Sequence, residues 1–403
     1  MAGINRRIFL KGVGLIGCSA AAHPLTTTLT MASAPGEARL VVIILRGAMD
    51  GLDVVQPRGE AAYARLRPTL SALPGALDLD GRFWLHPAMS GLYPLWQAGE
   101  LGFVHAVSTP YRDKRSHFDG QDVLEAGTGL DVPEPQVRDG WLNRMLGALP
   151  GLTAETAYAI GREDLAVLAG AAPVRNWTPE LSFELSAQNR LLLEHVYHDD
   201  PLFRDAGREA IELASAADVA EAMAGGEAAP AMGGAAGQRA DVARIVDFTA
   251  ERLLGETRIA AFSQTGWDTH AGQGRAMTQS LDRLGETMLR LRERLGPVWG
   301  KTTVLAVTEF GRTVAENGSR GTDHGTGGLM VMAGGAVRGG RVYGRWPGLA
   351  EADLYERRDL MPTGDVRAYA AWAMRGLFGL DRGLLEGTVF PGLQMEEDPG
   401  ILL

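Results

Sequence analysis

The sequence has almost no cysteine, since Cys18 is the only one among 403 residues. A single cysteine excludes an intrachain disulfide and a cysteine-based metal cluster. Any metal ion must therefore be held by histidine, aspartate, glutamate or hydroxyl groups, which suits zinc, manganese, magnesium or calcium.

An excess of positive charge is also missing, because the formal net charge is −10. This balance predicts no general attraction to nucleic acid or to an anionic membrane. The sequence shows no internal repeat and no glycine-rich phosphate loop after a strand. Beyond the N-terminal region it lacks the roughly 18 uncharged apolar residues that span a bilayer. A strongly acidic protein that binds anionic esters needs local cations, and bound metal ions are one way to supply them.

The N-terminus has the pattern of an export signal. Arg6 and Arg7 precede a short apolar run and a stretch of small residues that reaches "TMASAP". The paired arginines resemble the twin-arginine signal, with an ordinary basic signal as the alternative. We expect residues 1–34 to be an export signal that is cleaved off near residues 32–34. The protein is then expected to be periplasmic or extracellular, after export by the twin-arginine translocase. "LIGC" also resembles a lipobox, so a membrane is a partner only if Cys18 is lipidated.

Strand and helix patterns alternate at 39–130 and again at 258–335. Continuous apolar runs predict strands buried on both faces, as in a parallel sheet, at 39–45, 101–107, 258–263, 303–308 and 327–337, with a short further one at 165–170. Helical patterns predict helices at 118–126, 140–149, 276–296 and 365–380.

These patterns predict one α/β domain over residues 35–403, with a central, largely parallel sheet between helices. Residues 178–255 indicate a helical excursion from this domain. A low-complexity Ala/Gly loop within it, at 224–238, is expected to be mobile.

Acids and histidines follow four of the predicted strands. They are Asp50; then Arg115, Ser116, His117, Asp119 and Asp122; then Asp268 and His270; and last Glu309, Asp323 and His324. Because ligands of open parallel sheets bind at the carboxyl ends of the strands, we expect one shared metal site. Taken singly, Asp50 and Ser116 could be helix caps and the Asp–His pairs could be turns.

This set of residues suits ester hydrolysis. Divalent ions can clamp the attacking and leaving oxygens of a phosphoryl or sulfuryl transfer, with carboxylates and neutral imidazoles as ligands. Ser116 precedes a helical stretch, where the helix dipole and a metal ion would stabilise its alkoxide for attack. Arg115, Arg46 or Arg312 could hold ester oxygens. Alternatively, the metal ion activates water directly and Ser116 is only a cap.

Several motifs together resemble a known family. They are "LRGAMDGLDVVQP", "LHPAMSGLYPLWQAGELGFVHAVSTPYRDKRSHFDGQDVLEAG", "GWLNRML", "GWDTHAGQ" and "TVLAVTEFGRT" followed by "GTDHGTGG". In this order, over residues 38–392, they resemble a bacterial, twin-arginine-exported family known only as a domain of unknown function. That family is grouped with the alkaline-phosphatase-like superfamily of phosphatases, sulfatases and phosphomutases.

The resemblance implies a largely parallel sheet sandwiched by helices, with one or two divalent ions at the strand ends. It implies metal binding by Asp50, Asp268, His270, Glu309, Asp323 and His324. It also implies that Ser116 is the nucleophile, and we expect Arg115 and His117 to assist it.

The sequence departs from the superfamily pattern at two metal-binding positions. Glu309 and Phe310 stand where an Asp-His pair is usual, and Asp268 and His270 are two residues apart where many relatives use four. A sulfatase would also need a cysteine for formylglycine, so its absence favours phosphate. We expect an exported metal-dependent hydrolase of a small-molecule or polymer phosphate ester, less so sulfate. The alternative is a non-catalytic exported binding or assembly factor that retains a structural metal site.

Overall fold

The computed structural model describes residues 29–33, 36–112, 114–129, 139–149, 165–177 and 235–403. The chain divides into two compact units, and the larger comprises Thr26–Thr178 and Ile245–Leu403. The other comprises Met1–Leu25 and Pro179–Arg244, of which residues 235–244 are described, as the first part of helix α9 (Ala235–Leu254). The larger unit holds the central sheet and all the residues predicted to form the site.

A nine-stranded sheet lies at the centre of the larger unit, in the order β11-β6-β10-β9-β2-β8-β1-β7, and β12 also pairs with β6. Its strands are β1 (Leu29–Ser33), β2 (Arg39–Leu45), β6 (Leu101–Ser108), β7 (Arg175–Trp177), β8 (Thr257–Gln264), β9 (Thr302–Val307), β10 (Gly328–Ala333), β11 (Val342–Tyr343) and β12 (Gly364–Asp365). A small second sheet contains β3 (Val55–Gln56), β4 (Leu77–Asp78) and β5 (Trp84–Leu85).

Most strands of the large sheet run in one direction. β2 is parallel to β8 and β9, and β6 is parallel to β11 and β12. β10 is antiparallel to β9 and β6, and β1 is antiparallel to β8 and β7. The prediction of a central, mostly parallel sheet is therefore confirmed, with β10 and β1 as its two reversed strands.

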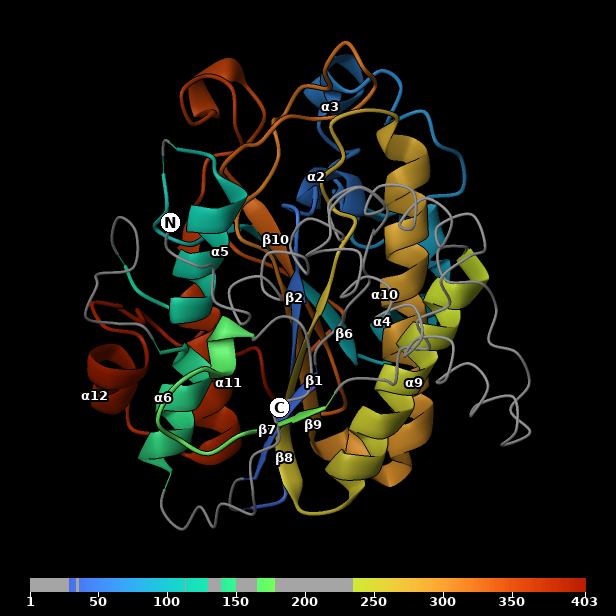
Figure 1. Cartoon of the computed structure of the whole chain (residues 1–403). Helices are drawn as coiled ribbons and strands as arrows, with labels where there is room; N and C mark the ends of the chain where they lie inside the picture. Colours follow the sequence, from blue (N-terminus) through green and yellow to red (C-terminus); the bar gives the residue numbers. More distant parts are fainter. Residues whose placement is uncertain (1–28, 34–35, 113, 130–138, 150–164, 178–234) are drawn as a thin grey trace, which may run out of the picture. The chain divides into compact units, whose positions relative to one another are not determined.

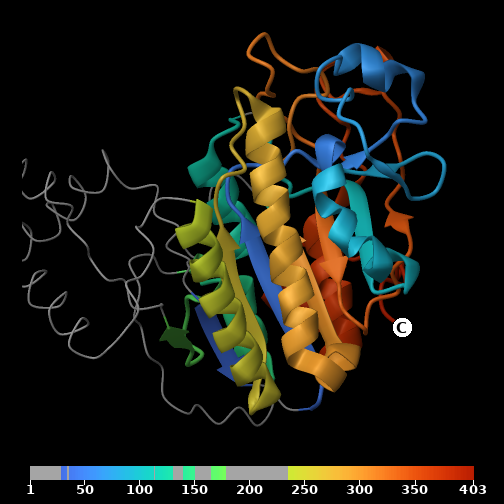
Figure 2. The same cartoon turned by 90° about the vertical axis from the view of Figure 1, so that its right-hand side faces the viewer.

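Helices cover both faces of this sheet (Figures 1 and 2). On one side lie α5 (His117–Ala126), α6 (Trp141–Ala148) and α11 (Val366–Phe378), and on the other lies α10 (Gln273–Leu295). The shorter helical segments are α2 (Gly51–Val54), α3 (Ala61–Leu66), η1 (Pro87–Leu92), α4 (Tyr93–Gln97), η2 (Ala166–Leu168), η3 (Gly296–Lys301), η4 (Glu351–Asp353), α12 (Arg382–Leu384) and η5 (Leu385–Val389).

Strand β2 shows why the sequence forms a covered sheet. All seven of its residues are buried. Leu40, Val42 and Ile44 join a core cluster with residues of α6 and α11. Since successive side chains of a strand point to opposite faces, Val41 and Ile43 face the other layer. Both faces are covered, so a continuous apolar run replaces the alternation of a half-exposed strand.

The segment at 165–170 is a correction to the predicted strands. Ala166–Leu168 forms the short 3-10 helix η2, and not a strand. Its backbone is satisfied by side chains, because Val167 N–H donates to Glu125 and the Leu168 carbonyl accepts from Asn143. These partners take the place of a neighbouring strand.

The helical excursion predicted at 178–255 is described only from residue 235 onward, where α9 forms. Helix α9 begins inside the segment that was predicted to be a mobile Ala/Gly loop. The other residues of that loop lie outside the described residues. The predicted signal at 1–34 is described only as β1, and Arg6, Arg7 and Cys18 also lie outside. Among the described residues, no helix combines the length and the apolar character that crossing a membrane requires.

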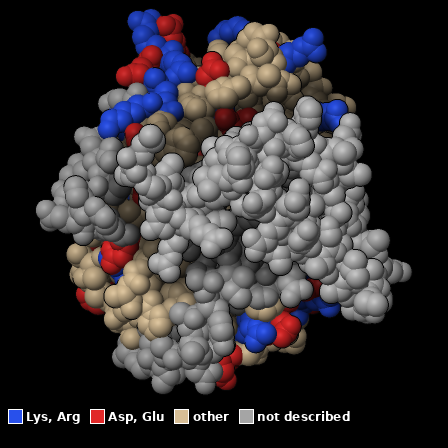
Figure 3. All heavy atoms as spheres, in the orientation of Figure 1, with Lys and Arg blue, Asp and Glu red and all other residues tan. Residues whose placement is uncertain are grey.

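The strand directions bring the predicted site residues to one edge. β2, β6, β8 and β9 run the same way, so their carboxyl ends meet at that edge, where α2 and α3 also lie (Figure 1). β10 runs in the opposite direction, so the residues that precede Gly328, among them His324, reach the same edge. In the same orientation, side chains of both charge signs gather along the upper rim of the molecular surface (Figure 3).

Candidate metal centre

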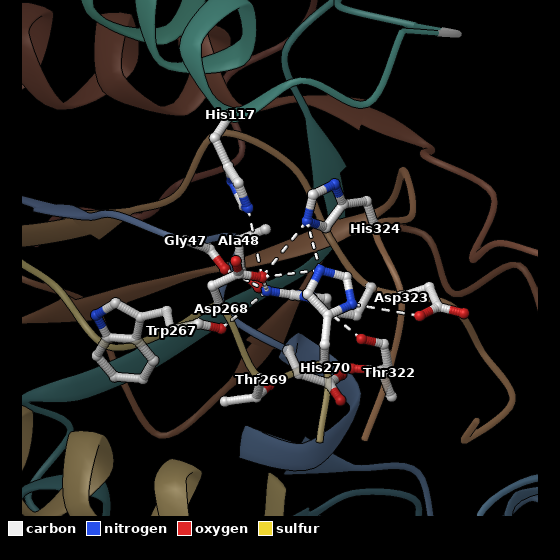
Figure 4. A network of polar contacts seen from close by, with 12 residues as sticks. Gly47, Ala48, His117, Trp267, Asp268, Thr269, His270, Thr322, Asp323 and His324 are labelled. Carbon is white, nitrogen blue, oxygen red and sulfur yellow. Dashed lines mark hydrogen bonds and ion pairs between the residues drawn. The ribbon is translucent and has the colours of Figure 1, made fainter. Parts of the chain in front are cut away.

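Asp268, in the loop after β8, is the point at which three imidazoles converge. Its Oδ1 lies 3.4 Å from Nε2 of His117, 3.4 Å from Nε2 of His324 and 3.1 Å from Nε2 of His270 (Figure 4). His117, Asp268 and His324 each offer one ligand atom, and these atoms lie within 4.8 Å of one another. This group could hold a metal ion.

Each of the three imidazoles is held by its other nitrogen, which faces an oxygen. The pairs are His117 Nδ1 with Glu309 Oε1 at 2.8 Å, His324 Nδ1 with the Arg115 carbonyl at 2.7 Å, and His270 Nδ1 with Asp323 Oδ1 at 3.3 Å. Carbonyl and carboxylate oxygens only accept hydrogen bonds, so in the neutral imidazoles Nδ1 carries the proton. The Nε2 lone pairs then point toward Asp268, as in histidines that bind metals in proteins.

Two further observations fit a cation at this place. Nε2 of His117 is buried, and its contact with Asp268 Oδ1 at 3.4 Å lacks the geometry of a hydrogen bond, so among the described residues this nitrogen has no hydrogen-bond partner. Nε2 of His270 lies 2.9 Å from Nε2 of His324. Two lone pairs repel at this distance, so a proton or a cation must lie between or beside them. The residues present therefore fit a divalent ion with imidazole and carboxylate ligands.

The side chain of Arg312 holds the Asp268 carboxylate in place. Arg312 is buried, and its Nη2 lies 2.6 Å from Asp268 Oδ1. Burial raises the pKa of the Asp268 carboxyl, but its contacts with the His117 and His324 imidazoles and the hydrogen bond from Arg312 outweigh this effect and hold that pKa well below its usual range. Asp268 is therefore a carboxylate at neutral pH, ready to bind a cation.

The pKa of His117 is shifted upward, opposite to that of Asp268. Burial lowers the pKa of its imidazole, but the contact with Asp268, the hydrogen bond to Glu309 and the negative charges of both carboxylates raise it to about 9. The ring also stacks on Phe310, with ring centroids 5.3 Å apart. The same two carboxylates would favour a divalent cation beside this imidazole.

Glu309 and Asp323, two predicted metal ligands, lie behind the imidazoles. Glu309 is fully buried, and its Oε1 also accepts hydrogen bonds from Gly47 N at 2.9 Å and Gln121 Nε2 at 3.2 Å. Asp323 Oδ1 accepts from Asn317 Nδ2 at 3.1 Å. Both carboxylates therefore orient histidines in this structure, and a direct metal role for them stays a prediction.

Asp50 has a different set of neighbours. It caps the N-terminus of α2, where its Oδ1 accepts from Leu52 N at 3.2 Å. Its Oδ2 lies 2.6 Å from Arg67 Nη1 and 2.6 Å from Gln273 Nε2. The structure therefore does not bring Asp50 into the His117–Asp268–His324 group.

Ser116, predicted to be the nucleophile, is the N-cap of α5. Its Oγ accepts from Asp119 N at 3.4 Å, and its backbone N–H donates to the Tyr111 hydroxyl. The capping interpretation of Ser116 is therefore observed, and a catalytic role stays a prediction.

The three arginines proposed to hold an anion are engaged with other protein groups. Arg115 is paired with Glu356 at 2.9 Å and with Asp359 at 3.3 Å. Arg46 lies 2.7 Å from Glu125, and Arg312 contacts Asp268. The structure assigns Arg115 a role that its sequence position did not suggest, because its backbone carbonyl, at a φ of 50°, holds His324.

Sequence reasoning missed the side chains that support the centre. They are Gln121, Asn317, Phe310 and Gln273. For two of them the position in the sequence gave a signal: Phe310 follows Glu309 directly, and Gln121 stands one helical turn after His117.

One family model, described as a protein of unknown function (DUF1501), matches residues 106–372. This range covers more than half of the 403 residues and includes His117, Asp268 and His324. No significant match was found among curated proteins or among solved structures. The chain therefore belongs to the DUF1501 family of proteins of unknown function.

Proposed function

We propose that this protein is a metal-dependent hydrolase of phosphate esters whose divalent ion is held by His117, Asp268 and His324. The observation that carries the proposal is the convergence of Nε2 atoms on Asp268 Oδ1, with each Nδ1 held by an oxygen. Among the metals that suit the sequence, imidazole ligands favour zinc over magnesium and calcium. Such an ion supplies Lewis acidity and lowers the pKa of a water molecule.

The proposal includes an alkaline-phosphatase-like architecture. It is supported by the motif resemblance and by ligands at the carboxyl ends of a mostly parallel sheet. Phosphate is favoured over sulfate because the chain from residue 19 onward contains no cysteine that could become formylglycine.

We favour water over Ser116 as the attacking group. A serine nucleophile needs a general base within hydrogen-bond reach. Across the described residues, no imidazole or carboxylate hydrogen-bonds to Ser116 Oγ, and the neighbouring His117 directs its Nδ1 to Glu309. In this proposal Ser116 caps α5 and thereby fixes the first turn, which carries His117.

The central experiment measures metal content and turnover together. Purified protein should contain about one zinc ion per chain by elemental analysis, and a chelator should abolish hydrolysis of p-nitrophenyl phosphate until zinc is restored. His324→Ala should lose both the ion and turnover. His86→Gln, which also removes a buried imidazole but lies outside the group, should keep both.

Three results would contradict parts of the proposal. Failure of the protein to bind zinc, cobalt or manganese would remove the metal centre and the enzyme with it. Metal binding without turnover of phosphate or sulfate esters would favour the exported binding or assembly factor instead. A burst of product, or a trapped phosphoserine that is lost in Ser116→Ala, would show that Ser116 attacks and not water.

Export by the twin-arginine route is also proposed, on the strength of Arg6-Arg7 and the apolar run that follows. Replacing both arginines by lysine should leave the protein in the cytoplasmic fraction, whereas the parent chain should reach the periplasm. Export of the double variant at the parental level would instead support an ordinary signal.

A further inference from the structure

A buried glutamine contacts both loops that carry the candidate metal centre, the loop with Asp268 and the loop with His324. Gln273 is the first residue of α10 and is fully buried. A glutamine amide has two N–H donors and two acceptor lone pairs. Nε2 donates to Asp50 Oδ2 at 2.6 Å and to Asp53 Oδ2 at 3.0 Å. Oε1 accepts from Thr269 Oγ1 at 3.0 Å and Thr322 Oγ1 at 2.7 Å, so all four positions of the amide are used.

The two hydroxyls on Gln273 belong to the two loops of the centre. Thr269 stands between Asp268 and His270, and Thr322 stands two residues before His324. The amide oxygen of Gln273 therefore accepts a hydrogen bond from each loop, at a position within two residues of the predicted ligand.

The backbones of these two loops are also joined directly. Thr322 N–H donates to the Thr269 carbonyl at 3.2 Å, and Gln273 N–H donates to the Arg320 carbonyl at 2.9 Å. A Cβ atom on Gly321 would lie only 2.4 Å from the backbone of His270, so the loops touch where only glycine fits. The segments 268–273 and 317–324 consequently form one packed unit.

The orientation of the Gln273 amide is set by the carboxylates of Asp50 and Asp53. Carboxylates only accept hydrogen bonds, so the NH₂ group must face Asp50 and Asp53 and the oxygen must face the hydroxyls. Asp50 is itself held by Arg67 at 2.6 Å. Arg67 also donates to the carbonyls of Val314 at 2.8 Å and Thr313 at 2.7 Å, so Asp50 cannot turn freely.

We propose that Gln273 is a positioning residue that sets the distance between the Asp268 and His324 loops, and that Asp50 orients its amide instead of binding metal. This inference rests on the metal centre of the proposed function. The contact between His324 and Asp268 depends on where the two loops sit, so loosening Gln273 changes the geometry offered to an ion without removing any ligand. Supporting side chains of this kind typically change metal affinity by about 10- to 100-fold.

The test compares Gln273→Met, which keeps the length but removes the hydrogen bonds, with Gln279→Met at an exposed position of the same helix. Cobalt affinity is measured by competition with a chromophoric chelator, and the visible spectrum of the cobalt form is recorded. We expect Gln273→Met still to bind one ion, about 10- to 100-fold more weakly and with an altered spectrum. Parental affinity and spectrum in Gln273→Met would overturn the proposal, even if the variant unfolds at a lower temperature.

Hydrogen exchange of the metal-free protein tests the role of Gln273 in joining the loops independently of the proposed function. Peptides that cover 266–275 and 315–325 should exchange faster in Gln273→Met than in the parent or in Gln279→Met. If the parent binds no cobalt, the proposed function fails, and the metal-positioning role of Gln273 fails with it. Faster exchange would then show only that the amide joins the loops. Unchanged exchange overturns the joining role whatever the metal result.

A double-mutant cycle decides the role of Asp50. If Asp50 acts through Gln273, then Asp50→Asn and Gln273→Met should not add, and the double variant should lose about as much cobalt affinity as the worse single variant. If Asp50 is instead a metal ligand, the two losses multiply and the number of bound ions falls in Asp50→Asn. That outcome contradicts the second half of the proposal.

Discussion

His117 Nδ1 lies 2.8 Å from Oε1 of Glu309, a carboxylate with no exposed surface. The acid that ends β9 therefore acts on the centre through an imidazole. Because the charge of Glu309 is buried and shared among several donors, it makes His117 a stronger base and fixes the direction of its ring.

Glu309→Gln should weaken metal binding while leaving the ligand set complete. The neutral amide still accepts from His117 but no longer raises the basicity of the ring, so we expect about 10- to 100-fold lower cobalt affinity. Competition with a chelator measures it. Glu316→Gln, which alters a carboxylate bound to Thr69, should keep the parental affinity. Equal affinities of the two variants would mean that Glu309 has no influence on the ion.

Gly120→Ala should destabilise the protein, although alanine favours helices. A Cβ at Gly120 would lie 2.8 Å from the ring of Phe310, which stacks on His117. We expect a loss of about 1–3 kcal/mol in the free energy of unfolding, from overpacking. Gly147→Ala in α6 meets no atom within 4 Å and should gain about 0.5–1 kcal/mol. Urea unfolding of both variants measures these changes. A higher free energy of unfolding in Gly120→Ala would show that Phe310 moves aside freely.

Asp53 should make the protein less stable as the pH rises from 4 to 6. Burial, and then the charge of Asp50, raise the pKa of Asp53 from its ordinary 3.8 to about 6. Between these values the folded protein binds more protons than the unfolded chain, so the free energy of unfolding falls with rising pH, on the order of 2 kcal/mol in all. Urea unfolding across this range should show a smaller fall in Asp53→Asn. Identical pH profiles would exclude this titration.

Asp247 should have the opposite dependence. Hydrogen bonds from Arg290, with distances of 2.7 and 2.6 Å, and from Arg294 lower the pKa of Asp247 to about 2 against the effect of burial. Its contribution is complete above pH 4 and is lost as the pH falls through 2. The pair is about one-third exposed, so we expect Asp247→Asn to cost at most about 1 kcal/mol at pH 7. The difference from the parent should shrink below pH 4; a difference that grows there would contradict the assignment.

The sheet could be predicted because its signal is local. The run at 39–45 is buried on both faces, and β2 has those bounds. The direction of β10 could not be read from its apolar residues. It follows from the connection, since residues 308–327 contain no helix to carry the chain back over the sheet, and a neighbour reached without such a crossover pairs in the antiparallel sense.

The position of the candidate metal centre could be predicted from the sequence, but the role of each residue in it could not. Asp268 and His324 follow strands that end at one edge, which the strand pattern indicates. Which atom faces the centre depends on loop conformation and on partners distant in sequence, as when Arg115 offers its carbonyl and not its guanidinium. Gln273 carried no signal at all, because a glutamine at the start of a helix is ordinary until two carboxylates and two hydroxyls surround its amide.

The chain separation within the centre has a consequence for how an ion is acquired. His117 and its support Glu309 are 192 residues apart, and Asp268 and His324 are separated by 56. An unfolded chain cannot hold these groups together, so capture of the proposed ion would await completion of the sheet. An ion that binds only the native state also stabilises it in proportion to the logarithm of the free ion concentration. Occupancy of the centre would thus report that folding is finished, and the ions available in the compartment where the sheet closes would decide which metal the protein carries.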